Sequence, residues 1–274
     1  MKATLITAVA LAALSLGQAQ PVIDVGGVVN NASYRKAGTP GYGIAQGSLF
    51  AVFGERLGPT NLFVAGAWPL GESLAGTSVE VTVGEVTLKA IPVYTSARQV
   101  GAVLRSHTPA GEGTIVVRYD GETSAPASIR IVPRAFGIFT QNSAGHGPAN
   151  AQQVRADARR PMNSASDPAR PGELVCLWGT GLGPVSGDEA SGPRPGDMAV
   201  EFKVLVGDRP AEVVYRGRSG CCAGIDEVYF HVPEGVKDCA APVVIRSGGH
   251  TSNLATLAVA DEHGVCGNPA FRAP

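Results

Sequence analysis

The residues with the clearest chemical potential in this sequence are its five cysteines: Cys176, Cys221, Cys222, Cys239 and Cys266. Two of them are adjacent, within the stretch RSGCCAGIDE at positions 218–227. Thiols in such a pattern can bind a metal, act as a redox couple or form structural disulfides. A zinc site is disfavoured because the adjacent pair lacks the usual spacing between two thiolate ligands. We therefore predict no metal ligand.

The order of the predicted strands narrows the pairing of the cysteines. Apolar runs at 225–232, 241–247 and 253–260 read as strands, and the last two form a hairpin with a Gly-Gly tip. Cys221 and Cys222 then lie at one pole, and Cys239 and Cys266 lie at the other. A seven-residue strand spans about 23 Å, whereas a disulfide needs Cα atoms within about 7 Å.

This geometry favours a Cys239–Cys266 bridge and leaves Cys221 and Cys222 to form a vicinal one. A crossed pairing such as Cys222 with Cys239 stays open, as do free or metal-bound thiols. Cys176 lies in the middle of an apolar run and is expected to be a buried small hydrophobe. Loops at the poles of sandwich folds commonly carry binding, so the candidate contact loop comprises Arg218, Cys221, Cys222 and Ile225.

The other motifs predict no catalytic residue and no cofactor. There is no G-x-S-x-G elbow, and the five histidines are scattered. GTGLG at 179–183 is followed by Pro184 rather than by a helix, so it reads as a turn and not as a dinucleotide-binding loop. We expect a non-enzymatic interaction or structural module. A carbohydrate-active or other hydrolase is one alternative, and a thiol-redox protein using the Cys221–Cys222 pair is the other.

The elements that position these residues are expected to be strands. The chain has 36 glycines, 20 prolines and 16% charged residues, and its short Val, Ile, Leu and Thr runs are interrupted by turn residues. In the run ELVCLWG at 173–179, Leu174, Cys176 and Trp178 alternate with Val175 and Leu177, as in a strand with one buried side. This punctuation is typical of an all-β sandwich.

Two pairs of segments repeat in the same order. The segment at 46–59 matches that at 171–184, with Phe53 corresponding to Trp178, and the segment at 114–131 matches that at 242–259 without a gap. We therefore predict two tandem immunoglobulin-like β-sandwiches that arose by internal duplication. The expected boundaries are a first sandwich at 20–133, a connector at 134–167 and a second sandwich at 168–274. All five cysteines lie in the second copy, so they serve something that the first copy lacks.

Several motifs together resemble a known family. They are VVNNASY at 28–34, IAQGSLFAVFGERLG at 44–58, GIF at 137–139, PGELVCLWGTGLGPV at 171–185 and CCAGIDEVYFHVPEGV at 221–236. Their order and spacing resemble the uncharacterised C-terminal module of exported Acidobacteria proteins such as those of Solibacter. The resemblance spans about Gly26 to Cys266 and implies tandem IPT/TIG-like immunoglobulin domains. That family has no assigned activity, so no catalytic residues are transferred.

The N-terminus predicts export. An apolar run follows Lys2, and a small-x-small cleavage pattern ends near position 19, so residues 1–19 read as a signal peptide. No later run approaches the roughly 20 apolar residues of a spanning helix. The net charge of −1 without a basic patch disfavours nucleic acid as a partner. We expect a secreted, cell-surface or periplasmic protein whose partner is an unknown protein or polysaccharide in the envelope or outside the cell.

Overall fold

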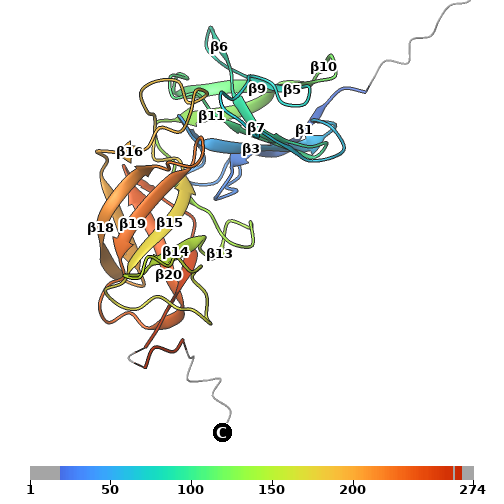
Figure 1. The fold of residues 1–274 in the computed structure, drawn as a ribbon. Coiled ribbons are helices and arrows are strands. Elements are labelled where there is room, and N and C mark those ends of the chain that lie inside the picture. The colour runs from blue at the N-terminus through green and yellow to red at the C-terminus, as the bar shows by residue number, and fades with distance from the viewer. Residues whose placement is uncertain (1–18, 262, 267–274) are drawn as a thin grey trace, which may run out of the picture.

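The computed structural model describes residues 19–261 and 263–266, and it is all-β over these residues. The predicted signal peptide lies outside the described residues except for its last position. Two β-sandwiches follow one another along the chain and lie against each other at one end (Figure 1). The predicted fold class, tandem immunoglobulin-like sandwiches, is confirmed.

The first sandwich consists of two facing sheets. One sheet has the order β1 (Val22–Asn30), β3 (Leu49–Glu55), β8 (Gln99–Val103), β7 (Ile91–Thr95) and β4 (Phe63–Val64). The other has the order β2 (Ile44–Ala45), β11 (Ala127–Val132), β9 (Gly111–Tyr119), β5 (Thr77–Val83) and β6 (Val86–Lys89), with β10 (Glu122–Thr123) beside β9. All pairings are antiparallel except that of β2 with β11.

The second sandwich repeats this plan, but its two sheets are continuous. The path runs β12 (Gly137–Ile138), β15 (Leu174–Thr180), β19 (Asp226–His231), β18 (Arg209–Arg218), β17 (Phe202–Val206), β20 (Asp238–Ser247), β22 (Ala255–Val259) and β13 (Gly147–Pro148). Three short strands are added at the sides: β14 (Ala151–Val154), β16 (Gly196–Asp197) and β21 (His250–Thr251). The sheets join at β18, whose first residues pair with β17 and whose later residues pair with β19.

Strand alternation places one side of each sheet in a core. In β15, Val175 and Leu177 point into the second core, where they join Val228 and Phe230 of β19. In the first sandwich, Phe50 and Val52 of β3 occupy the corresponding core. Burying side chains of this size stabilises each by roughly 1.5–3 kcal/mol, so each sandwich has a core of its own.

The two sandwiches share strand register and a buried hydroxyl. Val52 faces Val100 across one sheet, and Leu177 faces Val228 at the corresponding place. Ser124 Oγ accepts a hydrogen bond from the Val117 amide at 3.0 Å and donates to the Ala125 carbonyl at 3.0 Å. Ser252 Oγ makes the same two bonds with the Ile245 amide at 3.0 Å and the Asn253 carbonyl at 2.8 Å. These shared features are what an internal duplication predicts.

The segment at 134–167 differs from the expected connector because it builds the second sandwich. Its strands β12 and β14 both pair with β15, and β13 pairs with β22. Ala151 of β14 faces Leu177 just as Val28 of β1 faces Val52, so β14 occupies the place of β1. The sequence hid this strand because AQQV is short and polar. Gln153 is nevertheless fully buried, and its amide donates to the Asp167 carbonyl at 2.6 Å.

The matched serines provide a test of the shared architecture. We expect Ser124→Ala and Ser252→Ala each to lower the free energy of unfolding by about 1–3 kcal/mol, because each leaves a buried backbone amide without an acceptor. Chemical denaturation of both variants measures the two losses. Ser166→Ala, whose exposed hydroxyl contacts only Ser164, is the control and should change stability by less than about 0.5 kcal/mol. A loss at only one of the two buried serines would contradict the equivalence.

Candidate binding surface

The loop that carries the adjacent cysteines is an enlarged hairpin connection. In the first sandwich β7 and β8 are joined by residues 96–98, whereas β18 and β19 are joined by residues 219–225. The extra residues reach across to the first sandwich. Ala223 and Ile225 pack in an apolar cluster with Leu49 and Val103, which belong to β3 and β8. The loop therefore has a base between the two sandwiches and a tip outside them.

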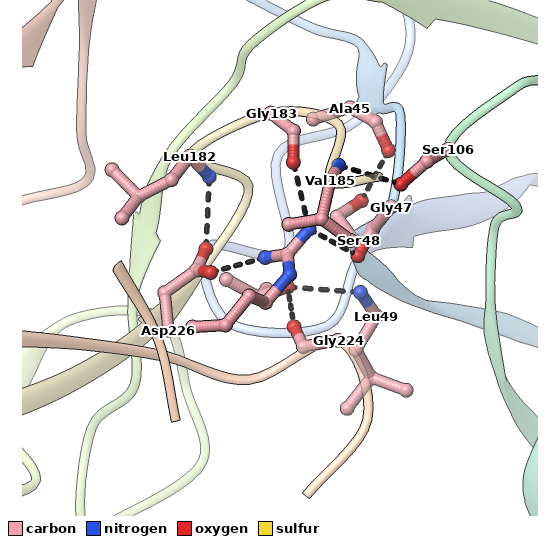
Figure 2. Close-up of polar contacts among 12 residues, drawn as sticks. Ala45, Gly47, Ser48, Leu49, Ser106, Leu182, Gly183, Val185, Gly224 and Asp226 are labelled. Atoms are coloured by element: carbon pink, nitrogen blue, oxygen red, sulfur yellow. Dashed lines mark hydrogen bonds and ion pairs between the residues drawn. The ribbon is translucent and has the colours of Figure 1, made fainter. Parts of the chain in front are cut away.

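A buried ion pair anchors the base of this loop. Arg218, the last residue of β18, pairs with Asp226, the first residue of β19, and their side chains are 3% and 0% exposed. The guanidinium also donates to the carbonyls of Gly183 and Gly47, each at 2.7 Å. Gly47 belongs to the first sandwich, so the Arg218 side chain forms hydrogen bonds with both sandwiches. Figure 2 shows these carbonyls converging on the guanidinium.

Gly47 makes this approach possible. Its backbone has φ +70°, and a Cβ there would lie 2.5 Å from the Arg218 Nη2 atom and 2.6 Å from the Ser106 Oγ atom. Any side chain would therefore collide with the guanidinium as well as strain the backbone. Gly47 and Gly172 are matching positions of the two halves, and in the first half the glycine allows the close approach of the Arg218 guanidinium.

The Asp226 carboxylate is fully enclosed and needs its partners. Besides Arg218, it accepts a hydrogen bond from the Leu182 amide at 2.8 Å (Figure 2). Burial raises the pKa of Asp226, and the Arg218 guanidinium and the amides of Leu182 and Gly181 oppose that shift. Removal of either charge would leave the other buried without compensation, which is costly in the interior of a protein.

Further hydrogen bonds cross the same interface. Thr180 Oγ1 accepts from the Leu49 amide at 2.8 Å and donates to the Gly224 carbonyl at 2.5 Å, so it connects the first sandwich to the loop (Figure 2). The Val185 amide donates to Ser106 Oγ at 2.9 Å, and the buried Glu189 accepts from the Ser106 amide at 2.9 Å. These bonds fix the angle at which the two bodies meet.

The structure corrects half of the candidate contact loop. Arg218 is buried in the interface, and Ile225 is half-buried with its side chain packed against the first sandwich, so the interface takes up most of both side chains. The sequence could not show this because the burial comes from the other sandwich, about 170 residues away in the chain. Cys221 and Cys222 are exposed at the tip.

The structure joins both cysteine pairs that the sequence favoured. Cys221 and Cys222 form a vicinal disulfide with Cα atoms 3.8 Å apart, and Cys239 is joined to Cys266 with Cα atoms 5.2 Å apart. Cys239 lies inside β20 rather than before it, at the end of the strand remote from the first sandwich. Cys176 is a buried free thiol, and burial raises its pKa to about 12.

An aromatic surface that the sequence reasoning missed lies beside the loop. We call Trp178 of β15, Tyr229 of β19 and Tyr215 of β18 the aromatic face; all three are half-buried on the outer side of the sheet. The signal that could have found part of it is alternation along EVYFH, which places Tyr229 and Glu227 on one side of a strand. Tyr215 joins them only because β18 has a bulge between Val213 and Tyr215, which the sequence does not reveal.

Glu227 lies between these rings and connects them to the loop. Its carboxylate accepts hydrogen bonds from Trp178 Nε1 at 3.2 Å, from Ser219 Oγ at 2.6 Å and from Tyr229 Oη at 3.3 Å. Ser219 in turn accepts from the Cys221 amide and lies 3.1 Å from the Cys221 Sγ atom. The aromatic face and the disulfide tip are therefore one connected surface.

Over the described residues, no group of three or more His, Cys, Asp or Glu side chains is arranged to hold a metal ion. In the same part of the chain, no helix has the length and apolar character needed to span a membrane.

Comparison with known proteins finds no match among protein-family models or curated proteins. Similar solved structures include the plexin A4 extracellular region (13% identity, TM-score 0.29, 94% of this chain and 20% of that chain). Another is SGBP-B of the Bacteroides ovatus mixed-linkage glucan utilization locus, in complex with a mixed-linkage heptasaccharide (10%, 0.32, 82% and 45%). A third is the Yersinia pseudotuberculosis adhesin InvE (15%, 0.22, 78% and 55%). At these values the similarities carry no argument about what this chain binds.

The buried ion pair predicts a large effect of a single substitution. We expect Asp226→Ala to lower the free energy of unfolding by about 3–5 kcal/mol, because it leaves the Arg218 charge buried and unpaired. Glu55→Ala removes the exposed ion pairs of Glu55 with Arg98 and Arg56 and should cost less than about 1 kcal/mol. Denaturant titrations compare the two. Equal losses would show that Asp226 does not carry a buried charge pair.

The cysteine pairing predicts the result of peptide mapping. After free thiols are blocked and the protein is digested without reduction, we expect one peptide that carries an internally oxidised Cys221–Cys222 pair and a cross-link between the Cys239 and Cys266 peptides. Cys239→Ser should lower stability by about 3.5 kcal/mol on the chain-entropy model for a 27-residue separation. A Cys222–Cys239 cross-link would overturn this assignment.

Proposed function

We propose that this protein is an exported, non-enzymatic binding module whose contact surface is the aromatic face together with the Cys221–Cys222 tip. One observation carries the proposal. The loop that bears the tip is anchored in a buried contact between two sandwiches, while the tip itself and the adjacent aromatic rings face outward.

The anchoring supports binding because it fixes the surface before a partner arrives. Arg218 and Thr180 hold the base of the loop against the first sandwich, and Glu227 holds the rings against the loop. A surface whose side chains are already ordered loses less conformational entropy on association. Tyrosine and tryptophan also supply large contact areas from few rotatable bonds.

Export is supported by the predicted signal peptide and by the two cysteine pairs. Disulfides persist in oxidising compartments and are uncommon in the cytosol. The resemblance to the C-terminal module of exported Acidobacteria proteins points in the same direction. In that setting the partner is a component of the cell envelope or of the extracellular material, either protein or polysaccharide.

A co-sedimentation assay tests this function. Purified mature protein is mixed with the isolated envelope of the source organism, and the bound fraction is measured after centrifugation. We expect saturable binding that Trp178→Ala weakens by about tenfold or more, as truncation of an aromatic anchor does. Phe53→Ala, at the matching position of the first sandwich, is the control and should leave the bound fraction unchanged.

The thermal unfolding of both variants is measured alongside, so that loss of fold is distinguished from loss of binding. Absence of saturable binding by the wild type would overturn the proposed function. Equal weakening by Trp178→Ala and Phe53→Ala, with both proteins folded, would place the contact surface elsewhere.

A further inference from the structure

Side chains on the outer side of the sheet form two neighbouring rows at the aromatic face. The first row contains Cys176, Tyr229 and Tyr215, which face one another across β15, β19 and β18. The second row contains Trp178 opposite Glu227. Tyr215 and Tyr229 meet edge to face, with ring centroids 5.8 Å apart and an interplanar angle of 79°. The surface therefore presents two tyrosine rings that are nearly perpendicular to each other, beside a tryptophan and a carboxylate.

Hydrogen-bonding groups lie at the margins of these rings. Arg160 donates to Tyr229 Oη at 3.2 Å, and its guanidinium carbon lies 5.9 Å from the centroid of that ring. Tyr215 Oη donates to the Arg218 carbonyl at 2.7 Å and accepts from the Gly196 amide at 3.2 Å. The Glu227 carboxylate and the Arg160 guanidinium therefore place opposite charges beside these rings.

This composition selects the chemistry of the ligand. A purely apolar partner would bury Glu227 and Arg160 without replacing their water, which is costly. A polyanion would meet the Glu227 carboxylate. A neutral saccharide fits both features, because its C–H faces are apolar and can cover aromatic rings while its hydroxyl groups can exchange hydrogen bonds with the carboxylate and the guanidinium.

The same face of the first sandwich carries a different arrangement of side chains. The positions of Trp178, Glu227 and Tyr229 are occupied there by Phe53, Gln99 and Gly101, at matching register. The ring of Tyr94 lies over Gly101, where a Cβ would be 2.0 Å from it, and burial raises the pKa of Tyr94. Tyr94 Oη is also bound by Asn31 and Gln99. In the first sandwich, the Tyr94 ring therefore occupies the outer face above Gly101.

The second sandwich differs on this face by two local changes. Tyr229 stands where the first sandwich has Gly101, so Tyr215 cannot lie flat over the strand and instead meets Tyr229 edge to face. The longer loop at 219–225 then adds Ser219 and the disulfide tip at one margin. These changes occur together in the copy that also holds all five cysteines.

From this geometry we infer that the aromatic face binds a neutral saccharide chain, with Trp178 as the stacking platform, Tyr229 and its Arg160 neighbour as a lateral contact, and Glu227 as the acceptor for sugar hydroxyls. The vicinal disulfide borders the chain as a rigid margin. This inference rests on the proposed function and specifies the chemical class of its ligand.

Affinity electrophoresis in native gels tests the inference. The probes are three uncharged polymers, namely hydroxyethylcellulose, galactomannan and amylopectin, with polygalacturonate as the anionic comparison. We expect the wild type to be retarded by at least one uncharged polymer and not by polygalacturonate. Trp178→Ala and Tyr229→Ala should each abolish the retardation, and Phe53→Ala should leave it intact.

A fluorescence titration provides a second, site-specific readout. The chain has two tryptophans, so Trp68→Phe leaves Trp178 as the sole indole. Addition of the polymer that retards the protein should change the Trp178 emission in this background, and Glu227→Gln should shift the titration midpoint several-fold upward. Because Glu227→Gln keeps the size of the side chain, it reports on the acceptor even where an alanine variant unfolds.

The outcomes separate the two proposals. Envelope binding that depends on Trp178, without retardation by any uncharged polymer, overturns the saccharide inference and leaves the proposed function standing. Retardation by polygalacturonate equal to that by the neutral polymers overturns the inference as well, because the ligand would then be an acidic one. Retardation that persists in folded Trp178→Ala and Tyr229→Ala proteins overturns the assignment of the site.

Discussion

The arrangement of this protein depends on one buried ion pair. Arg218 and Asp226 close the two ends of the β18–β19 connection, and the same guanidinium binds backbone carbonyls of both sandwiches. Desolvation of the two charges offsets much of their attraction, so the net contribution of such an enclosed pair to the free energy of folding is small. Its contribution is geometrical. It fixes where the loop begins, where the first sandwich docks, and therefore which residues are left at the tip.

The two sandwiches use the same framework for different purposes. Their strand registers and buried serines agree, so their central strands follow the same design. Besides the short strands at the edges of the second sandwich, they differ on one outer face and in one hairpin loop. The first sandwich places the Tyr94 ring over Gly101 and connects the strands by a short turn, whereas the second has Tyr229 in place of that glycine and extends the loop onto its neighbour. The framework that both sandwiches share supplies stability, and the longer hairpin loop of the second supplies the surface.

The vicinal disulfide fits this division. A loop of seven residues that must both cross to another domain and present a tip has few internal contacts to order it. The covalent link between Cys221 and Cys222 and the hydrogen bonds of Ser219 restrict the tip directly. The Cys239–Cys266 link lies at the end of β20 that is remote from the first sandwich, and it ties Cys266 to that strand. The two links therefore act on separate ends of the second sandwich.

The sequence by itself determined the fold class, the repeated framework and the favoured cysteine pairs. Strand alternation, turn residues and matching segments are local signals, and local sterics and burial enforce them wherever the chain folds. Only the tertiary structure decided that β14 belongs to the second sandwich, that Arg218 is an interface residue and that Tyr215 joins the aromatic face. Each of these depends on a contact distant in sequence or on a bulge that shifts the register of the side chains. A single sequence cannot report such features, because the residues involved have ordinary local patterns and acquire their role from neighbours that only folding brings together.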